Sequence, residues 1–483
     1  MNADTPLFLP PDFTPAAGEI TLLTLTCVVL IVDLFVDDRR RWITYAASLL
    51  TLALTAVAVV AVAGDNTVFT FNDTFVLDPL STVLKLFTLA IVGLVFVYSR
   101  EYLQARGLER GEFYLLSLFA TLGILVLISA YNMLTLYLGL ELLSLSLYAM
   151  VAINRNNAVA AESAMKYFVL GAIASGCFLF GVSIIYGATG ALGLDEIATA
   201  AARVDTSNIH VLFGLSFILV GIAFKFGAVP FHMWVPDVYH GAPTPVTLFI
   251  GSAAKVASFA LLLRVVVEGL GAMHASWGGM LLVLSILSMA VGNIVAIAQT
   301  NLKRMLAYST ISHVGFILMG FLAGSVRGVE AALYYTLAYV IMAAAAFGMI
   351  LLLSRRGFEA DELDDLKGLN ARSPWFAGVM LIVMFSMTGV PPLLGFYAKL
   401  AVLGAAVEAG LTWLAVVGVI FSVIGAFYYL RVIKLMYFDE PEDLAPIAAR
   451  TDMRLALSLN GVLVLALGIF PNGLISLCNQ VIS

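Results

Sequence analysis

The sequence predicts an all-α polytopic membrane protein with two inverted five-helix repeats. Hydrophobic residues make up 61% of the 483 residues and charged residues only 12%, about half the charged share of a typical soluble domain. The apolar runs are continuous over ~20 residues, the length with which an α-helix crosses a bilayer. Membrane β-strands would instead alternate between apolar and polar residues. The composition therefore predicts membrane helices, with the lipid bilayer as a partner.

About fourteen spans follow one another with short loops, in one membrane domain over residues 1–483. They lie near residues 19–36, 42–63, 79–99, 113–130, 132–152, 159–187, 209–229, 243–267, 277–299, 302–323, 328–353, 374–407, 411–436 and 453–470. The seventh span is expected to continue past a break to about Tyr239. The N-terminus has no basic residue before its first apolar run, so we expect the first span to stay as a helix.

Basic residues indicate the orientation of the spans. One set of alternate loops holds the basic residues of 39–41, 303–304 and 355–372 and eight further Arg or Lys residues, whereas the opposite set holds only Arg203 and Arg327, with Arg264 near a helix end. Because cytoplasmic loops carry an excess of Lys and Arg, both termini are expected outside the cytoplasm. No basic cluster is longer than residues 39–41, so nucleic acid is not an expected partner.

Motifs for redox or nucleotide chemistry are missing from the sequence. The cysteines Cys27, Cys177 and Cys478 are widely spaced and form no CxxC pattern. There is no GxGxxG after a strand and no phosphate-binding loop. We therefore expect no cofactor and no metal in this chain.

Two spans are interrupted by proline. The seventh, "LSFILVGIAFKFGAVPFHMWVP", breaks at Pro230 after Gly227, and the twelfth, "MLIVMFSMTGVPPLLGFYAKLAVL", breaks at Gly389 and the two prolines that follow Val390. Proline leaves a carbonyl of the preceding turn without its donor. In lipid such a group needs a polar partner or a wet cavity.

The two breaks are related in a way that predicts the repeats. They lie five spans apart, so the two helices cross the membrane in opposite directions. The repeats would comprise residues 113–267 and 277–436. Paired broken spans indicate a transport site, and Lys225 and Lys399 accompany the breaks. The alternative is two ordinary kinks, but a charge at the bilayer centre costs roughly 2.5–3.5 kcal/mol on an insertion scale.

Further charges lie at membrane depth. Glu141 is about nine residues (~14 Å) into the fifth span, and Lys255 about twelve residues (~18 Å) into the eighth. Small residues around Lys255 leave room for close packing or water. Glu141 and the lysines are candidates for transfer of a proton or cation, because a carboxylate that approaches a lysine changes its affinity for a proton. The alternative is static ion pairs that hold helices together.

Other polar residues leave their role open. Lys166 follows Glu162 by four residues, the order that favours a local helix ion pair. His313 lies among hydroxyl side chains, which suits a proton relay or a hydrogen-bonded core histidine. Lys85 is expected to be structural and to extend outward from the start of its span. Three residues beyond the first break line a proton entry or only solvate a loop: His232, Asp237 and His240.

Three segments carry a family resemblance over nearly the whole chain: "FKFGAVPFHMWVPDVYHGAPTPVT", "NLKRMLAYSTISHVGF" and "GVPPLLGFYAKL". The chain resembles the antiporter-like membrane subunits of proton-translocating NADH–quinone oxidoreductase, respiratory complex I. It is most similar to the N-type subunits. Lys399 stands where the M-type has a glutamate, and the chain ends soon after the last span, without the long lateral helix of the L-type.

The resemblance implies a fourteen-helix fold and a translocase role as one subunit of the complex, in the bacterial inner membrane. It implies pairing of Glu141 with Lys225, and a path for protons with Lys166 and His313 as lesser members: Glu141, Lys225, Lys255 and Lys399. FMN, iron–sulfur clusters and quinone would be held by other membrane and peripheral subunits of complex I.

Three other functions remain open on the sequence. A subunit of a multisubunit cation/proton antiporter shares this fold and moves ions that can include sodium, and a membrane-bound hydrogenase subunit is a related option. The set of partner subunits would distinguish them. A structural scaffold would use its buried charges only to fix helix packing.

Overall fold

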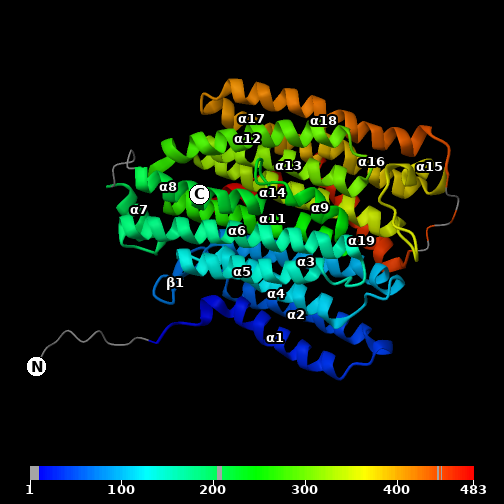
Figure 1. Cartoon of the computed structure of the whole chain (residues 1–483), viewed down its shortest axis with the longest axis horizontal. Coiled ribbons are helices and arrows are strands. Elements are labelled where there is room, and N and C mark those ends of the chain that lie inside the picture. The colour runs from blue at the N-terminus through cyan, green and yellow to red at the C-terminus, as the bar shows by residue number, and fades with distance from the viewer. Residues whose placement is uncertain (1–9, 204–208, 443–444, 446, 448, 483) are drawn as a thin grey trace, which may run out of the picture.

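The computed structural model of the chain confirms the helical membrane fold (Figure 1). It describes residues 10–203, 209–442, 445, 447 and 449–482. Among these residues, thirteen helical segments are long and apolar enough to cross a membrane. The interrupted pair α16 (Pro374–Thr388) and α17 (Leu394–Glu408) supplies one more, in agreement with the span count expected from the sequence.

The other spans match the predicted ranges to within a few residues. They are α1 (Ala17–Leu34), α2 (Trp42–Val62), α3 (Pro79–Ala105), α4 (Gly111–Ser129), α5 (Met133–Val151), α6 (Ala158–Thr189), α8 (Ile209–Phe226), α10 (Thr244–Gly251) with α11 (Ala253–Leu262), α12 (His274–Ile297), α13 (Leu302–Leu322), α14 (Val326–Leu353), α18 (Thr412–Phe438) and α19 (Thr451–Ile469).

Shorter elements lie between and after the spans. They are the antiparallel hairpin β1 (Val68–Thr70) and β2 (Phe75–Leu77), the helices α7 (Leu194–Ala201), α9 (Trp234–Gly241), α15 (Leu369–Arg372) and α20 (Asn472–Ile482), a π-helix (Leu263–Gly269) and 3₁₀ turns at Thr14–Ala16, Asp38–Arg40, Gly271–Met273 and Leu363–Leu366. The sequence prediction had continued the seventh span to about Tyr239, and α9 is that continuation.

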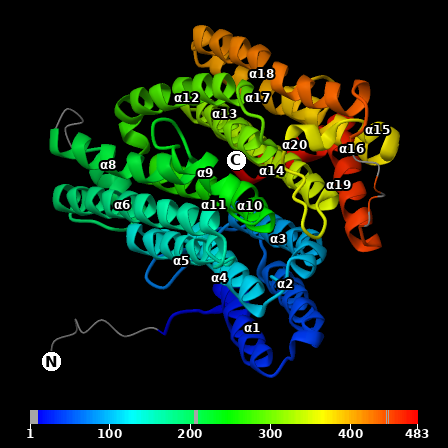
Figure 2. The same cartoon turned by 45° about the vertical axis from the view of Figure 1, so that its right-hand side comes forward.

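The helices lie side by side, from α1 and α2 at one end of the molecule to α18 at the other (Figures 1 and 2). The spans α10–α11 and α14 run through the middle, and the apolar stretch of each is buried throughout. In α1 and α2 less than a third of that stretch is buried, since their outer faces have no protein neighbour among the described residues.

Polar side chains fix where several spans begin. Asp78 and Ser81 form a reciprocal capping box at the start of α3, with Pro79 in its first turn. Asn157, Asn301 and Ser325 cap α6, α13 and α14 by accepting from backbone N–H groups of the first turn. Such caps satisfy donors that a helix start leaves without partners.

The eighth span differs from its prediction as one uninterrupted helix. Ser252 has a non-helical backbone (φ −120°, ψ −87°) between α10 and α11, and its hydroxyl donates to Leu248 O. The π-helix follows α11 directly. No proline marks this span after its first turn, so the sequence offered no signal for the break. Lys255 therefore lies three residues beyond a third helix interruption.

Candidate functional site at the interrupted helices

The first break has a partner for each of the last four carbonyls of α8, which a helix end otherwise leaves without donors. Gly227 follows α8 with φ +75°, a conformation that glycine adopts without strain. The carbonyls of residues 223–226 accept from Ala228 N, Trp234 Nε1, Ser258 Oγ and Lys255 Nζ in that order. The bond from Lys255 to the last carbonyl, Phe226 O, is 2.8 Å.

The second break repeats this arrangement. Gly389 follows α16 with φ +92°, and Lys399 Nζ donates to Thr388 O, the last carbonyl of α16, at 2.7 Å. The same ammonium donates to Ser422 Oγ of α18 at 2.8 Å. Lysine thus caps the end of each broken half-helix, where the helix dipole places partial negative charge.

Lys225 differs from these two lysines because, within the part of the chain that the structure describes, its ammonium binds side chains and no carbonyl. Its Nζ donates to Ser144 Oγ of α5 at 2.5 Å and lies 5.9 Å from the centre of the Tyr148 ring. Among the described residues, no carboxylate lies within the 4.0 Å of an ion pair. Glu141 Oε1 is buried without a hydrogen-bond partner. The ion pair between Glu141 and Lys225 that the resemblance implies is not formed in this structure.

A small cavity joins the lysines of the first break. It has about 20 Å³ of space for a water centre and is lined by Ser144, Lys225, Lys255 and Ser258, among others. About one water fits such a space. The cavity therefore brings together two of the predicted site residues, Lys225 and Lys255.

His313 lies at the centre of a buried hydroxyl network. Its Nδ1 is 2.7 Å from Tyr335 Oη and its Nε2 is 3.1 Å from Tyr429 Oη. Further bonds extend the network: Ser309 with Tyr429, Thr310 with Tyr339 at 2.7 Å, and Asn293 with Ser312 and Tyr428. Both imidazole nitrogens have partners, so the geometry suits a relay as well as a satisfied core histidine.

Sequence reasoning missed the tyrosines of this network. They come from α14 and α18, and the only signal was their occurrence in "LYYTLAY" and "FYYL" within apolar spans. Phe316 separates the network from the second break: its ring stacks on Tyr335 with centroids 6.0 Å apart, and its centre lies 5.3 Å from Lys399 Nζ.

Lys166 lies apart from the buried candidate residues. Its side chain is 44% exposed and pairs with Glu162 at 2.9 Å, as the spacing predicts. It also pairs with Asp237 of α9 at 2.8 Å, and Asp237 in turn binds Arg304 of α13. Asp237 thus connects three helices. Nearby, His232 Nδ1 is buried without a hydrogen-bond partner, and His240 lies in the last turn of α9.

The expectation that Lys85 extends outward is wrong. The residue is 1% exposed, and its ammonium pairs with Glu19 of α1 at 2.7 Å. It also lies 5.0 Å from the centre of the Phe75 ring. Asp78, at the start of the same span, binds Arg264 instead. Because Glu19 of the neighbouring helix α1 pairs with the ammonium, Lys85 does not have to extend to the membrane surface to reach a polar partner.

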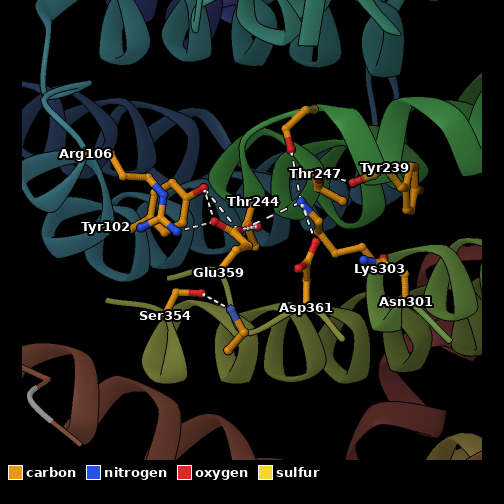
Figure 3. Close-up of polar contacts among 12 residues, drawn as sticks. Tyr102, Arg106, Tyr239, Thr244, Thr247, Asn301, Lys303, Ser354, Glu359 and Asp361 are labelled. Atoms are coloured by element: carbon orange, nitrogen blue, oxygen red, sulfur yellow. Dashed lines mark hydrogen bonds and ion pairs between the residues drawn. The ribbon is translucent and has the colours of Figure 1, made fainter. Parts of the chain in front are cut away.

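A second group that the sequence did not indicate surrounds Glu359 (Figure 3). Its carboxylate accepts from Arg106, Tyr102 and Thr244. Lys303, expected in a loop, is only 4% exposed, and its Nζ lies 3.5 Å from Asp361 Oδ2 and 3.8 Å from Glu359 Oε1. This cluster ties α3, α10 and α13 to the segment that precedes α16.

Family models match two parts of the chain. The model described as NADH:quinone oxidoreductase/Mrp antiporter, TM, matches residues 130–425. The model described as NADH-ubiquinone oxidoreductase chain 4, amino terminus, matches residues 20–128. The chain belongs to the family of membrane subunits that NADH:quinone oxidoreductases and Mrp antiporters share.

Individual relatives narrow the family. NADH-quinone oxidoreductase subunit N of Thioalkalivibrio sulfidiphilus is 60% identical over 477 residues, which cover 98% of this chain and 99% of that protein. Within the family, the chain therefore belongs with the N subunits.

Two solved structures share the fold of this chain. A chain of respiratory complex I from Thermus thermophilus with bound aureothin has a TM-score of 0.81 at 33% identity, over 95% of this chain and 98% of that one. A chain of the Mrp complex from a Dietzia species has a TM-score of 0.77 at 22% identity, over 97% and 96%, and shares the fold.

Proposed function

We propose that this chain is the proton-translocating N subunit of an NADH–quinone oxidoreductase and moves protons through a buried relay of Glu141, Lys225, Lys255, His313 and Lys399. The observation that carries the proposal is the lysine on the last carbonyl of each broken half-helix. Half-helix ends with such carbonyls are sites where membrane transporters hold cations. Lys166 is a lesser member, which holds Asp237 near the end of the first broken span.

The two five-helix repeats over residues 113–267 and 277–436 remain part of the proposal. The first two helices of each pack at equally close contacts. A Cβ on Gly123 of α4 would lie 2.5 Å from Leu143 N of α5, and a Cβ on Gly292 of α12 would lie 2.5 Å from Ser312 N of α13. Repeated contacts of this kind support a common origin of the two halves.

We infer the wider setting from the resemblance to complex I subunits. Electron transfer belongs to partner subunits that hold FMN, iron–sulfur clusters and quinone, and this chain contributes proton transfer alone. We place it in the bacterial inner membrane, with both termini outside the cytoplasm because of the asymmetry of basic loops. The N subunit that is 60% identical to this chain favours this function over a sodium-moving antiporter.

The proposal is tested with Lys225→Ala in the intact complex. NADH-driven proton uptake is measured in inverted vesicles, with quinone reduction and subunit content followed in the same membranes. We expect uptake to be lost or sharply reduced while the complex stays assembled. Lys434→Ala is the matched control, because that lysine is 63% exposed and pairs with Asp439 at the end of α18.

Two outcomes would count against the relay. Uptake at the wild-type rate in Lys225→Ala would remove Lys225 from the path. An absent complex would favour the scaffold function, and Lys225→Met then separates the two because methionine fills the same space without a charge. Full assembly without pumping in Lys225→Met would exclude the scaffold.

A further inference from the structure

Ser144 is the direct partner of Lys225 in this structure. The serine is 1% exposed. Its hydroxyl donates to Leu140 O at 2.5 Å, one turn earlier in α5, so its oxygen is left to accept from Lys225 Nζ. A hydroxyl has one donor and two lone pairs, and both functions are therefore used.

Glu141 lies within reach of the same ammonium. It precedes Ser144 by three residues, which places the two side chains next to each other on the helix surface, ~4.5 Å apart along its axis. The flexible stem of a lysine allows its ammonium to move over such a distance without motion of the backbone. Lys225 thus has two alternative acceptors on one helix, a neutral one and a charged one.

The two acceptors differ in what they face. Ser144 lines the cavity that Lys255 and Ser258 also line, whereas Glu141 does not. When Lys225 is bound to Ser144, its ammonium faces the space that leads to Lys255. A lysine drawn to Glu141 would leave this space and lose its access to a water there.

We propose that Ser144 is a positioning residue that competes with Glu141 for Lys225 and holds its ammonium against the cavity shared with Lys255. The inference rests on the proposed function, since it concerns a step of that relay. Ser144 takes no proton itself. It stabilises the arrangement in which Lys225 is separated from Glu141 and can exchange a proton with Lys255 through one water.

Removal of the hydroxyl should shift Lys225 toward Glu141. The loss of a hydrogen bond to a charged group should shift the equilibrium of Lys225 between Ser144 and Glu141 by at least about tenfold. We therefore expect Ser144→Ala to assemble normally but to slow NADH-driven proton uptake by about that factor. Ser144→Thr keeps the hydroxyl and should recover most of the rate.

Ser146→Ala is the matched control on the same helix. Ser146 is also buried and donates to the carbonyl four residues earlier, Leu142 O, at 2.8 Å. It makes no contact with a lysine among the described residues. This variant should pump at the wild-type rate, so a slow Ser144→Ala would not reflect a lost serine bond within α5.

A double-mutant cycle provides the decisive measurement. Glu141→Gln removes the charge that draws Lys225 away, so it should slow pumping less in the Ser144→Ala background than in the wild type, or even restore part of the rate. Additive effects would overturn the proposal, as would wild-type pumping in Ser144→Ala or equal rates for the alanine and threonine variants. If Lys225→Ala stops pumping while Ser144→Ala leaves it unchanged, only this inference fails. If Lys225→Ala pumps normally, the proposed function fails.

Discussion

The pair of Glu19 and Lys85 allows a quantitative test of which buried lysines are structural. The two charges meet at 2.7 Å, and their side chains are 8% and 1% exposed. Neither carboxylate oxygen of Glu19 has a further hydrogen-bond partner. Removal of one partner would leave the other charge buried and uncompensated. Such a change costs about 3–5 kcal/mol, whereas replacement of a whole buried pair by apolar residues of similar volume is often neutral.

We therefore predict that Lys85→Met and Glu19→Met each destabilise the protein by roughly 3–5 kcal/mol. The double variant should lie within about 1.5 kcal/mol of the wild type, a typical cost of a volume-conserving change in a core. The sum of the two single effects would thus exceed the effect of the double variant by several kcal/mol. This coupling energy is well above the 0.3–0.5 kcal/mol or so within which the effects of independent sites add.

The assay is unfolding of the purified complex by denaturant, with loss of this subunit as the signal, together with proton uptake in vesicles. The double variant should assemble and pump as the wild type does. If it assembles but fails to pump, Lys85 belongs to the proton path and its assignment as structural is wrong. If the single variants are as stable as the double variant, Glu19 and Lys85 do not form an ion pair in the membrane.

Two more predictions concern the ion pairs of Arg264 and the hydrogen-bonded network of His313. Arg264→Met should lower the unfolding temperature of the complex, because it leaves Asp78 and Glu268 without the guanidinium that binds both. Burial raises the pKa of Asp78, but Arg264 and the hydrogen bonds from Ser81 outweigh it and keep this pKa below its ordinary value. The ionised carboxylate thus stabilises the fold above its unfolded pKa of about 3.9, and this contribution is lost as the pH falls through the folded pKa. Unfolding temperatures from about pH 6 downward should fall in the wild type and be less pH-dependent in Arg264→Met; equal slopes would refute this. His313→Leu leaves the hydroxyls of Tyr335 and Tyr429 without the imidazole and should slow proton uptake more than His313→Gln, which keeps polar groups there; equal rates would mark His313 as a packing residue.

The spans and both proline breaks could be predicted because their signals are local in the sequence. Twenty apolar residues are sufficient for a membrane helix, and proline marks where a backbone cannot stay helical. The break at Ser252 escaped prediction, because no residue there excludes a helix. Charged residues inside apolar runs were equally visible, which is why the lysines could be named.

The partners of those charges could not be predicted, since they come from distant parts of the chain. Lys85 was expected to extend outward from the start of its span, but its ammonium pairs with Glu19 of α1. The tyrosines around His313 come from two other helices, and tyrosine is common in apolar spans. Burial of Lys303 depends on Glu359 and Asp361, which a sequence places in a polar loop.

Lys255 and Lys399 bind equivalent carbonyls at the two breaks, but they come from different places in the order of the spans. Lys255 binds the end of α8 from a different span, whereas Lys399 binds the end of α16 from the second half of the same interrupted span. Each is bound to the last carbonyl of a half-helix, and for Phe226 O the ammonium of Lys255 is the one donor found among the described residues, whereas Thr388 O also accepts from Ser422 Oγ at 3.5 Å. Moving the ammonium of Lys255 therefore leaves a buried acceptor without a partner at a cost of about 1–3 kcal/mol, and moving that of Lys399 breaks two hydrogen bonds. Lys225 does not cap a helix end in this way. The carbonyl of Lys225 accepts from Ser258, and among the described residues its ammonium donates only to Ser144. Of the three, Lys225 can therefore change partners at the lowest cost, which makes it the member of the relay best suited to respond to Glu141.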